Sequence, residues 1–161
     1  MVEKEKCKMI IAIVEKSKLG IKCQRYWPKN FLELPDYKLK TISVGSTKIF
    51  KYKKIEVLNK KTRIKFEVEH FHIHDWKDHG TLNSKFYKKY ANFLAFIISK
   101  QESFNFPIIA HCSAGIGRSG TFVASFYLFQ HFLQCKKKRV PFKFSIFDIV
   151  HKMREQRHKA V

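Results

Sequence analysis

The sequence is short of acidic residues, short of arginine and without any long apolar run. Thirteen Asp and Glu oppose 33 Lys and Arg, so the formal net charge is +20. No run approaches the roughly 18 apolar residues that cross a bilayer, so no membrane partner is expected. The amino-terminal residues include acids and lack the apolar core of a signal peptide. We therefore expect a soluble protein in a reducing, cytoplasmic setting.

Cysteine, glycine and proline are also scarce. Four cysteines without close pairing do not fit the framework of a disulfide-rich secreted scaffold. With only 6 Gly and 4 Pro, the chain shows no linker composition. A hydrophobic content of 45%, including 16 Phe, excludes a disordered segment. The 161 residues are long enough for one domain with a buried core.

The positive charge has three interpretations that composition alone leaves open. The charge could bind nucleic acid, it could form a lysine-rich surface that only keeps the protein in solution, or it could attract an anionic substrate such as a phosphoester. The basic residues are mostly lysines spread along the chain, and arginine, the usual reader of base edges, is rare. The densest run, Lys136–Arg139, follows a predicted helix, where cations suit the carboxyl-terminal dipole.

Apolar periodicity predicts four strands. The run from Lys8 to Glu15 is typical of a buried strand. Alternation of apolar and polar residues predicts strands over Thr47–Leu58 and Thr62–His70, joined by a hairpin turn at Asn59–Lys61. A short strand is predicted over Pro107–Ala110.

Steps of three and four residues between apolar side chains predict three helices. The first covers Ser84–Lys100 and has Asn83 or Ser84 as its cap. The second covers Gly117–Leu133. The third starts at Ser145, and its buried stripe is expected to contain Ile146, Ile149, Val150 and Met153.

The segment from His111 to Gly120 joins the last predicted strand to a helix and contains the strongest functional pattern. Cys112 stands at the strand end, and Arg118 at the helix start. Gly115 and Gly117 allow the backbone to curl so that several N–H groups point inward, which forms an anion site. Such positive surroundings favour a thiolate, and a thiolate beside a bound phosphoester is a nucleophile.

The string HCSAGIGRSG resembles the signature of the cysteine-dependent protein tyrosine phosphatase family. Residues 22–28 (KCQRYWP), 76–80 (WKDHG) and 153–157 (MREQR) are similar to further segments of that family, in the same order. The resemblance covers essentially the whole chain. It implies an α/β fold in which a twisted mixed sheet has helices on both sides, with residues 1–161 forming a partial catalytic domain.

The resemblance implies a role for each residue of the signature. Cys112 would be the nucleophile and Arg118 the phosphate clamp. Substrate phosphate would be cradled by the backbone of Ser113, Ala114, Gly115, Ile116 and Gly117. No metal or other cofactor is expected, because the guanidinium and the amides already neutralise the phosphoryl oxygens.

Four further residues acquire roles in the same way. Ser119 would hydrogen-bond the sulfur as it leaves, and His111 would hold the loop and tune the thiol. Asp78 would act as general acid and then as general base. Lys22 would contact this acid when its loop closes over the substrate.

The sequence departs from the family pattern in three places. Lys77 stands where the family has proline beside the general acid, which predicts slower chemistry because the loop is freer. The family's amino-terminal pocket tyrosine and its carboxyl-terminal glutamine loop do not align with any residue here. The chain is therefore expected to be a fragment or a trimmed copy. Its lysine- and phenylalanine-rich composition is similar to that of phosphatases carried by viruses of parasitoid wasps, and such a protein would act in the host cytoplasm.

The expected partners are phosphotyrosine-containing proteins, and nucleic acid is the less favoured class. Two alternatives remain: a catalytically impaired module that binds phosphotyrosine proteins, and an RNA 5′-phosphatase of the same superfamily. A metal hydrolase is disfavoured because its usual ligand spacing is not met by the candidate residues His70, His72, His74, Asp75, Asp78 and His79. The remaining cysteines, Cys7, Cys23 and Cys135, are expected to be packing residues.

Overall fold

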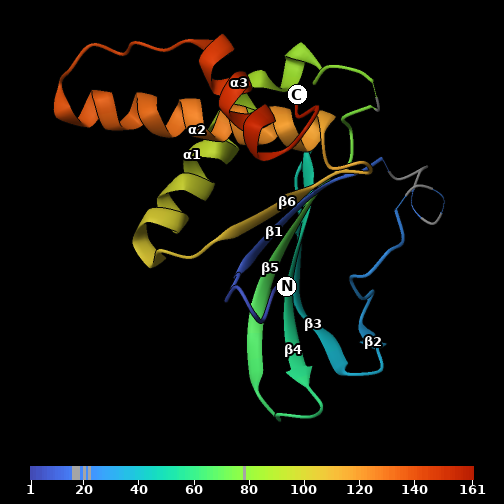
Figure 1. Ribbon diagram of the computed structural model, residues 1–161. Helices are drawn as coiled ribbons and strands as arrows, with labels where there is room; N and C mark the ends of the chain where they lie inside the picture. Colours follow the sequence, from blue (N-terminus) through green and yellow to red (C-terminus); the bar gives the residue numbers. More distant parts are fainter. Residues whose placement is uncertain (16–18, 20, 22, 78) are drawn as a thin grey trace.

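The computed structural model describes residues 1–15, 19, 21, 23–77 and 79–161. Its main feature is a six-stranded sheet in the order β2-β3-β4-β5-β1-β6 (Figure 1). The strands are β1 (Met9–Ile13), β2 (Phe31–Glu33), β3 (Tyr37–Ser46), β4 (Phe50–Asn59), β5 (Lys65–Ile73) and β6 (Ile108–His111). The helices are a 3₁₀ turn η2 (Ser84–Phe86), then α1 (Tyr87–Phe104), α2 (Gly117–Lys138) and α3 (Ile146–Gln156).

The central strand β1 determines where the loops meet. It pairs in parallel with both β5 and β6, and Ile11 lies opposite Phe71 on one side and Ala110 on the other. The remaining neighbours, from β2 to β5, pair antiparallel. Because parallel strands end at the same edge, the segments that follow β1, β5 and β6 lie together there.

One face of the sheet is covered by α1 and α2. Met9, Ile11 and Ile13 point to this face and belong to a cluster with Phe93 of α1 and Phe122 of α2. All five residues of β1 are buried, as expected for a strand with both faces covered. This packing fixes the start of α2 directly beyond the end of β6.

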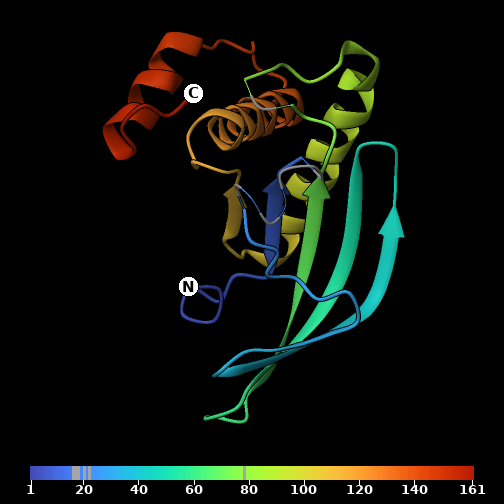
Figure 2. The ribbon, with the colours of Figure 1, turned by 90° about the vertical axis from the view of Figure 1, so that its right-hand side faces the viewer.

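The opposite face is covered without a helix, so the expectation of helices on both sides is wrong for the described residues. Ile10 and Ala12 pack there with Trp27, Ile55 and Val68. The chain between β1 and β2 provides Trp27, and the curled antiparallel strands complete the cover (Figure 2). Helix α3 lies against α2 rather than on the sheet. The α/β class with a twisted mixed sheet is confirmed.

Most predicted elements are present, with shifted ends. Asn59 forms the predicted hairpin turn, since its side-chain oxygen accepts the N–H groups of Lys61 and Thr62. Asn83 caps the helical segment before α1 by accepting the N–H of Lys85. Ser145 caps α3 by accepting the N–H of Asp148. Among the described residues, no helix is long and apolar enough to span a membrane.

Two expectations are wrong. The sequence patterns did not predict β2 and β3, because β2 has only three residues and the second half of β3 is exposed on both faces. The apolar stripe of α3 is not buried: Ile146 is 61% exposed, and no residue of the helix is fully covered. The reason is that α3 packs only loosely against α2 and reaches no part of the sheet in the described structure.

Candidate active site

The loop between β6 and α2 forms the floor of a cleft. Cys112 follows β6 directly and is 6% exposed, so only its tip reaches the cleft. Gly115 has a φ of +73°, a left-handed conformation that glycine adopts without strain and that turns the loop toward α2. The cleft encloses about 660 Å³, and its walls come from this loop, from residues 76, 79 and 80, and from Lys159 and Val161.

The thiol of Cys112 is surrounded by hydrogen-bond donors. Burial by itself would raise its pKa, but hydrogen bonds from the Ser119 hydroxyl and from the backbone N–H groups of Ser119, Gly115 and Ile116 favour the thiolate. The net result is a pKa below the ordinary thiol value. The Sγ atom lies 3.4 Å from Ser119 Oγ. Donors in the loop and at the helix start thus favour the thiolate of this buried sulfur despite its burial.

Arg118 lies beside this thiol with its guanidinium almost fully buried, at 5% exposure. One of its NH groups donates to the carbonyl oxygen of Trp76 at 3.2 Å and lies 4.0 Å from a carboxylate oxygen of Glu15. Glu15 was missed in the sequence, where it only marked the end of a strand. The parallel pairing of β1 and β6, which the sequence patterns did not indicate, brings residues 15 and 112 to the same edge.

His111 connects the loop to the face of the sheet that lacks helices. Its Nε2 atom lies 2.7 Å from the Tyr26 hydroxyl, and its Nδ1 atom lies 3.1 Å from the carbonyl oxygen of Cys112. The same hydroxyl lies 3.3 Å from Nε2 of His70. Burial, with smaller contributions from nearby His72 and His111, lowers the pKa of His70 to about 3, so His70 is neutral. Tyr26 therefore bridges two imidazoles directly beneath the cysteine.

Arg157, which follows α3, holds the loop from the opposite side. Its Nε donates to the carbonyl oxygen of Gly115 at 2.6 Å, and an NH₂ group donates to that of Ala114 at 3.2 Å. With these carbonyls turned toward Arg157, the amides of the loop are free to face the cleft. The 153–157 segment resembled the family, but no role was predicted for its last arginine.

The histidines of β5 are not the half-exposed strand residues that the sequence suggested. His70 and His72 are 1% and 4% exposed. The Nε2 atom of His72 lies 2.6 Å from the carbonyl oxygen of Val14. Together with the contact between His70 and Tyr26, this assigns both rings to hydrogen bonds within the core.

The structure brings most of the predicted site together. His111, Cys112, Arg118 and Ser119 adjoin, and the backbone of residues 113–117 curls between them. Asp78 and Lys22 lie outside the described residues. The neighbours of Asp78 line the cleft: the Trp76 indole N–H donates to the Gly80 carbonyl oxygen at 2.9 Å, which closes the 76–80 loop on itself.

Comparison with known proteins agrees with this geometry. The family model described as protein-tyrosine phosphatase matches residues 1–161. Tyrosine-protein phosphatase non-receptor type 20 of Rattus norvegicus is 30% identical over 98% of this chain and 36% of its own length. Tyrosine-protein phosphatase 2 of Dictyostelium discoideum is 32% identical over 89% of this chain and 38% of its own length.

A cysteine-containing loop at the carboxyl edge of a mixed sheet, followed by an arginine at a helix start, is the arrangement that the resemblance to cysteine-dependent phosphatases implies. The chain belongs to the protein-tyrosine phosphatase family. It spans about a third of the length of the curated relatives it matches.

Proposed function

We propose that this chain hydrolyses phosphotyrosine in proteins through a phosphocysteine intermediate. The observation that carries the proposal is the buried Cys112 thiol, which has a lowered pKa and lies 3.4 Å from Ser119 Oγ beside Arg118. A buried cysteine without these donors would have a raised pKa, as Cys7 does. Membership of the family supports the same reaction.

The reaction would proceed in two displacements. The Cys112 thiolate attacks phosphorus, the bond from phosphorus to the tyrosyl oxygen breaks, and Asp78 gives its proton to the departing phenolate. Water then attacks the phosphocysteine, Asp78 takes a proton from that water, and the thiolate leaves as inorganic phosphate forms. Ser119, within reach of Sγ, stabilises the sulfur in this second step.

The charge of the transferred phosphoryl group would be neutralised by the protein itself. Arg118 provides a planar pair of donors, and the inward amides between Ser113 and Arg118 provide the rest. The contacts of Arg118 with Trp76 and Glu15 hold the guanidinium in one orientation before substrate arrives. Lys22 is proposed to steady Asp78 when the 76–80 loop closes.

The test is phosphate release from a phosphotyrosyl peptide by the purified chain, with a chelator present. We expect release by the unsubstituted protein and by Cys135→Ser, a buried cysteine on α2 remote from the cleft. Cys112→Ser should abolish it. Activity that persists in Cys112→Ser, or that needs an added metal, would contradict the proposal.

Lys77 supports one second candidate, a phosphotyrosine-binding module with impaired turnover. It is exposed and stands where the family has proline beside the general acid. A stoichiometric burst of phenol without steady release of phosphate would favour this module over the enzyme. Hydrolysis of 5′-triphosphate RNA in preference to the phosphopeptide would instead favour the RNA phosphatase.

A further inference from the structure

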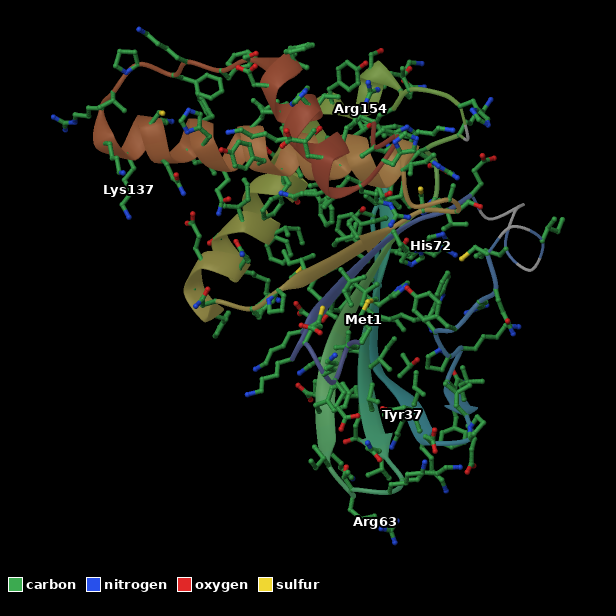
Figure 3. All side chains as sticks on the ribbon, viewed as in Figure 1. Met1, Tyr37, Arg63, His72, Lys137 and Arg154 are labelled. Atoms are coloured by element: carbon green, nitrogen blue, oxygen red, sulfur yellow. The ribbon has the colours of Figure 1, made fainter. Side chains whose placement is uncertain are left out.

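A second surface with a marked composition lies at the other end of α2. The segment from Lys136 to Phe147, here called the basic apolar segment, contains five cations and no carboxylate. It includes the end of α2 and the connection to α3, which runs back beside the helix (Figure 1). With a rise of about 1.5 Å per residue, the length of α2 separates Lys136–Arg139 from the loop at the start of the helix by roughly 30 Å. The connection then returns along the helix, where Phe144 lines a pocket with Val123 and Tyr127. Figure 3 shows Lys137 at this far end of the helix.

The cations of the basic apolar segment are exposed and unneutralised. Lys136, Lys137, Lys138, Arg139 and Lys143 all have exposed side chains. Within the part of the chain that the structure describes, no carboxylate forms an ion pair with any of them. Such a cluster creates a local positive potential that attracts a surface of negative charge.

Apolar side chains lie among these cations and face outward. Phe147 is 75% exposed, Ile146 61%, Phe144 54% and Val140 50%. They occur within eight residues of one another, on a connection where polar residues would be expected. Interleaved cations and exposed large apolar groups are the composition of segments that lie in the headgroup region of a membrane.

The basic apolar segment is held in place rather than free. Phe142 packs against the helix, with its ring centroid 5.5 Å from that of Phe132, and Phe144 stacks on Phe142 at 4.8 Å. The Nε2 atom of His131 lies 3.1 Å from the Lys143 carbonyl oxygen. Arg139 ends α2 in a left-handed conformation, with φ of 57°, which reverses the chain. Little ordering entropy is therefore lost on binding.

We propose that the basic apolar segment attaches the protein to anionic membrane surfaces. The lysines meet lipid phosphates and carboxylates, while Phe147, Ile146 and Val140 enter the headgroup region. The expectation of no membrane partner rested on the lack of a spanning segment, and surface attachment needs none.

The side chains favour lipid over single-stranded RNA and over a second copy of the chain. RNA is held by aromatic platforms together with arginine. The segment does expose the aromatic rings of Phe144 and Phe147, but four of its five cations are lysines, and Ile146 and Val140 add aliphatic side chains that do not stack on bases. A second copy would bring the same five positive charges against their counterparts, which costs free energy at an isologous interface.

The experiment is sedimentation of the full chain with sucrose-loaded vesicles. Vesicles of phosphatidylcholine with 30% phosphatidylserine should bind the protein, added salt should release it, and pure phosphatidylcholine should bind little. Replacing Lys136, Lys137 and Lys138 with Gln should weaken binding about a hundred-fold, since each lysine near the surface contributes about five-fold. The matched control replaces Lys85, Lys88 and Lys89, exposed lysines at the start of α1, with Gln.

The apolar part is tested separately. Phe147→Ser should weaken binding about ten-fold, and Phe31→Ser, at a 57% exposed position on β2, should not. Melting curves check that each variant is folded. Any of three results would overturn the proposal. The two triple-lysine variants could lose vesicle binding equally, neutral vesicles could bind the protein as well as anionic ones, or the protein could capture single-stranded RNA without binding vesicles. A dimer in solution that Phe147→Ser dissociates, while vesicles do not bind, would overturn it as well.

Discussion

Replacing Ser119 with Ala should raise the pKa of Cys112 without disturbing the fold. The Ser119 hydroxyl lies 3.4 Å from the sulfur and is 4% exposed, so water does not replace it easily. The backbone donors of Gly115, Ile116 and Ser119 remain in the variant. The substitution therefore removes one donor from the thiolate and leaves the others.

The size of the effect follows from the charge on the acceptor. A hydrogen bond to a charged group contributes about 1.5–3 kcal/mol, and one pKa unit corresponds to about 1.4 kcal/mol. The contact is longer than an ideal hydrogen bond, so the lower end of the range applies. We expect the pKa of Cys112 to rise by about one unit.

The assay is the pH dependence of alkylation by iodoacetamide, with the modified peptides identified by mass spectrometry. Cys7 and Cys23, whose pKa values burial raises, provide internal references that should react only at higher pH. Ser125→Ala is the matched control, because that hydroxyl also lies on α2 and donates to the Thr121 carbonyl oxygen rather than to the cysteine. A midpoint that does not move in Ser119→Ala, or that moves equally in the control, would refute the reasoning.

Three further predictions concern the groups around the loop. The folded pKa of His70 is about 3, below its unfolded value, so its contribution to stability is complete at pH 7 and is lost as the pH falls. The free energy of unfolding in urea should drop by about 2 kcal/mol between pH 7 and pH 5, and His70→Phe should flatten this dependence. Gly115→Ala should destabilise by about 1–3 kcal/mol, since its φ is +73° and the new Cβ would lie 2.8 Å from Arg157, while Gly117→Ala, with open space around it, should be nearly neutral in thermal melts. Arg157→Ala should weaken vanadate binding in calorimetry about ten-fold by releasing the loop. Arg139→Ala should not, because Arg139 is an exposed arginine at the far end of α2. Equal behaviour of the two arginine variants would show that the loop keeps its shape unaided.

Sequence patterns predicted the elements that have strong periodicity and buried surroundings. Five consecutive apolar residues predicted the buried strand β1, and apolar residues three and four positions apart predicted α1. Strand β3 was missed although its first half alternates, with Tyr37 and Leu39 half-buried and Lys38 exposed. Its second half is exposed on both faces. The alternating first half alone is too short to predict a strand.

The candidate site was predictable where one continuous segment contains the chemistry. The residues from His111 to Ser119 are adjacent in the chain, so their spacing alone indicated a phosphate loop. The supports of that loop come from other elements: Glu15 follows β1, Tyr26 precedes β2, and Arg157 follows α3. Only the sheet order brings these residues to the loop, and local patterns contain no information about that order.

The central position of β1 has a consequence for how the protein is made. Met9 pairs with Glu69 in β5 and with Ile108 in β6, so β1 is synthesised well before both of its partners. Such a high contact order slows folding, and the apolar β1 stays open to aggregation in the meantime. The last support of the loop, Arg157, is translated later still. A nascent chain should therefore acquire its complete anion site only after residue 157 has left the ribosome, and chaperone demand during expression should be high.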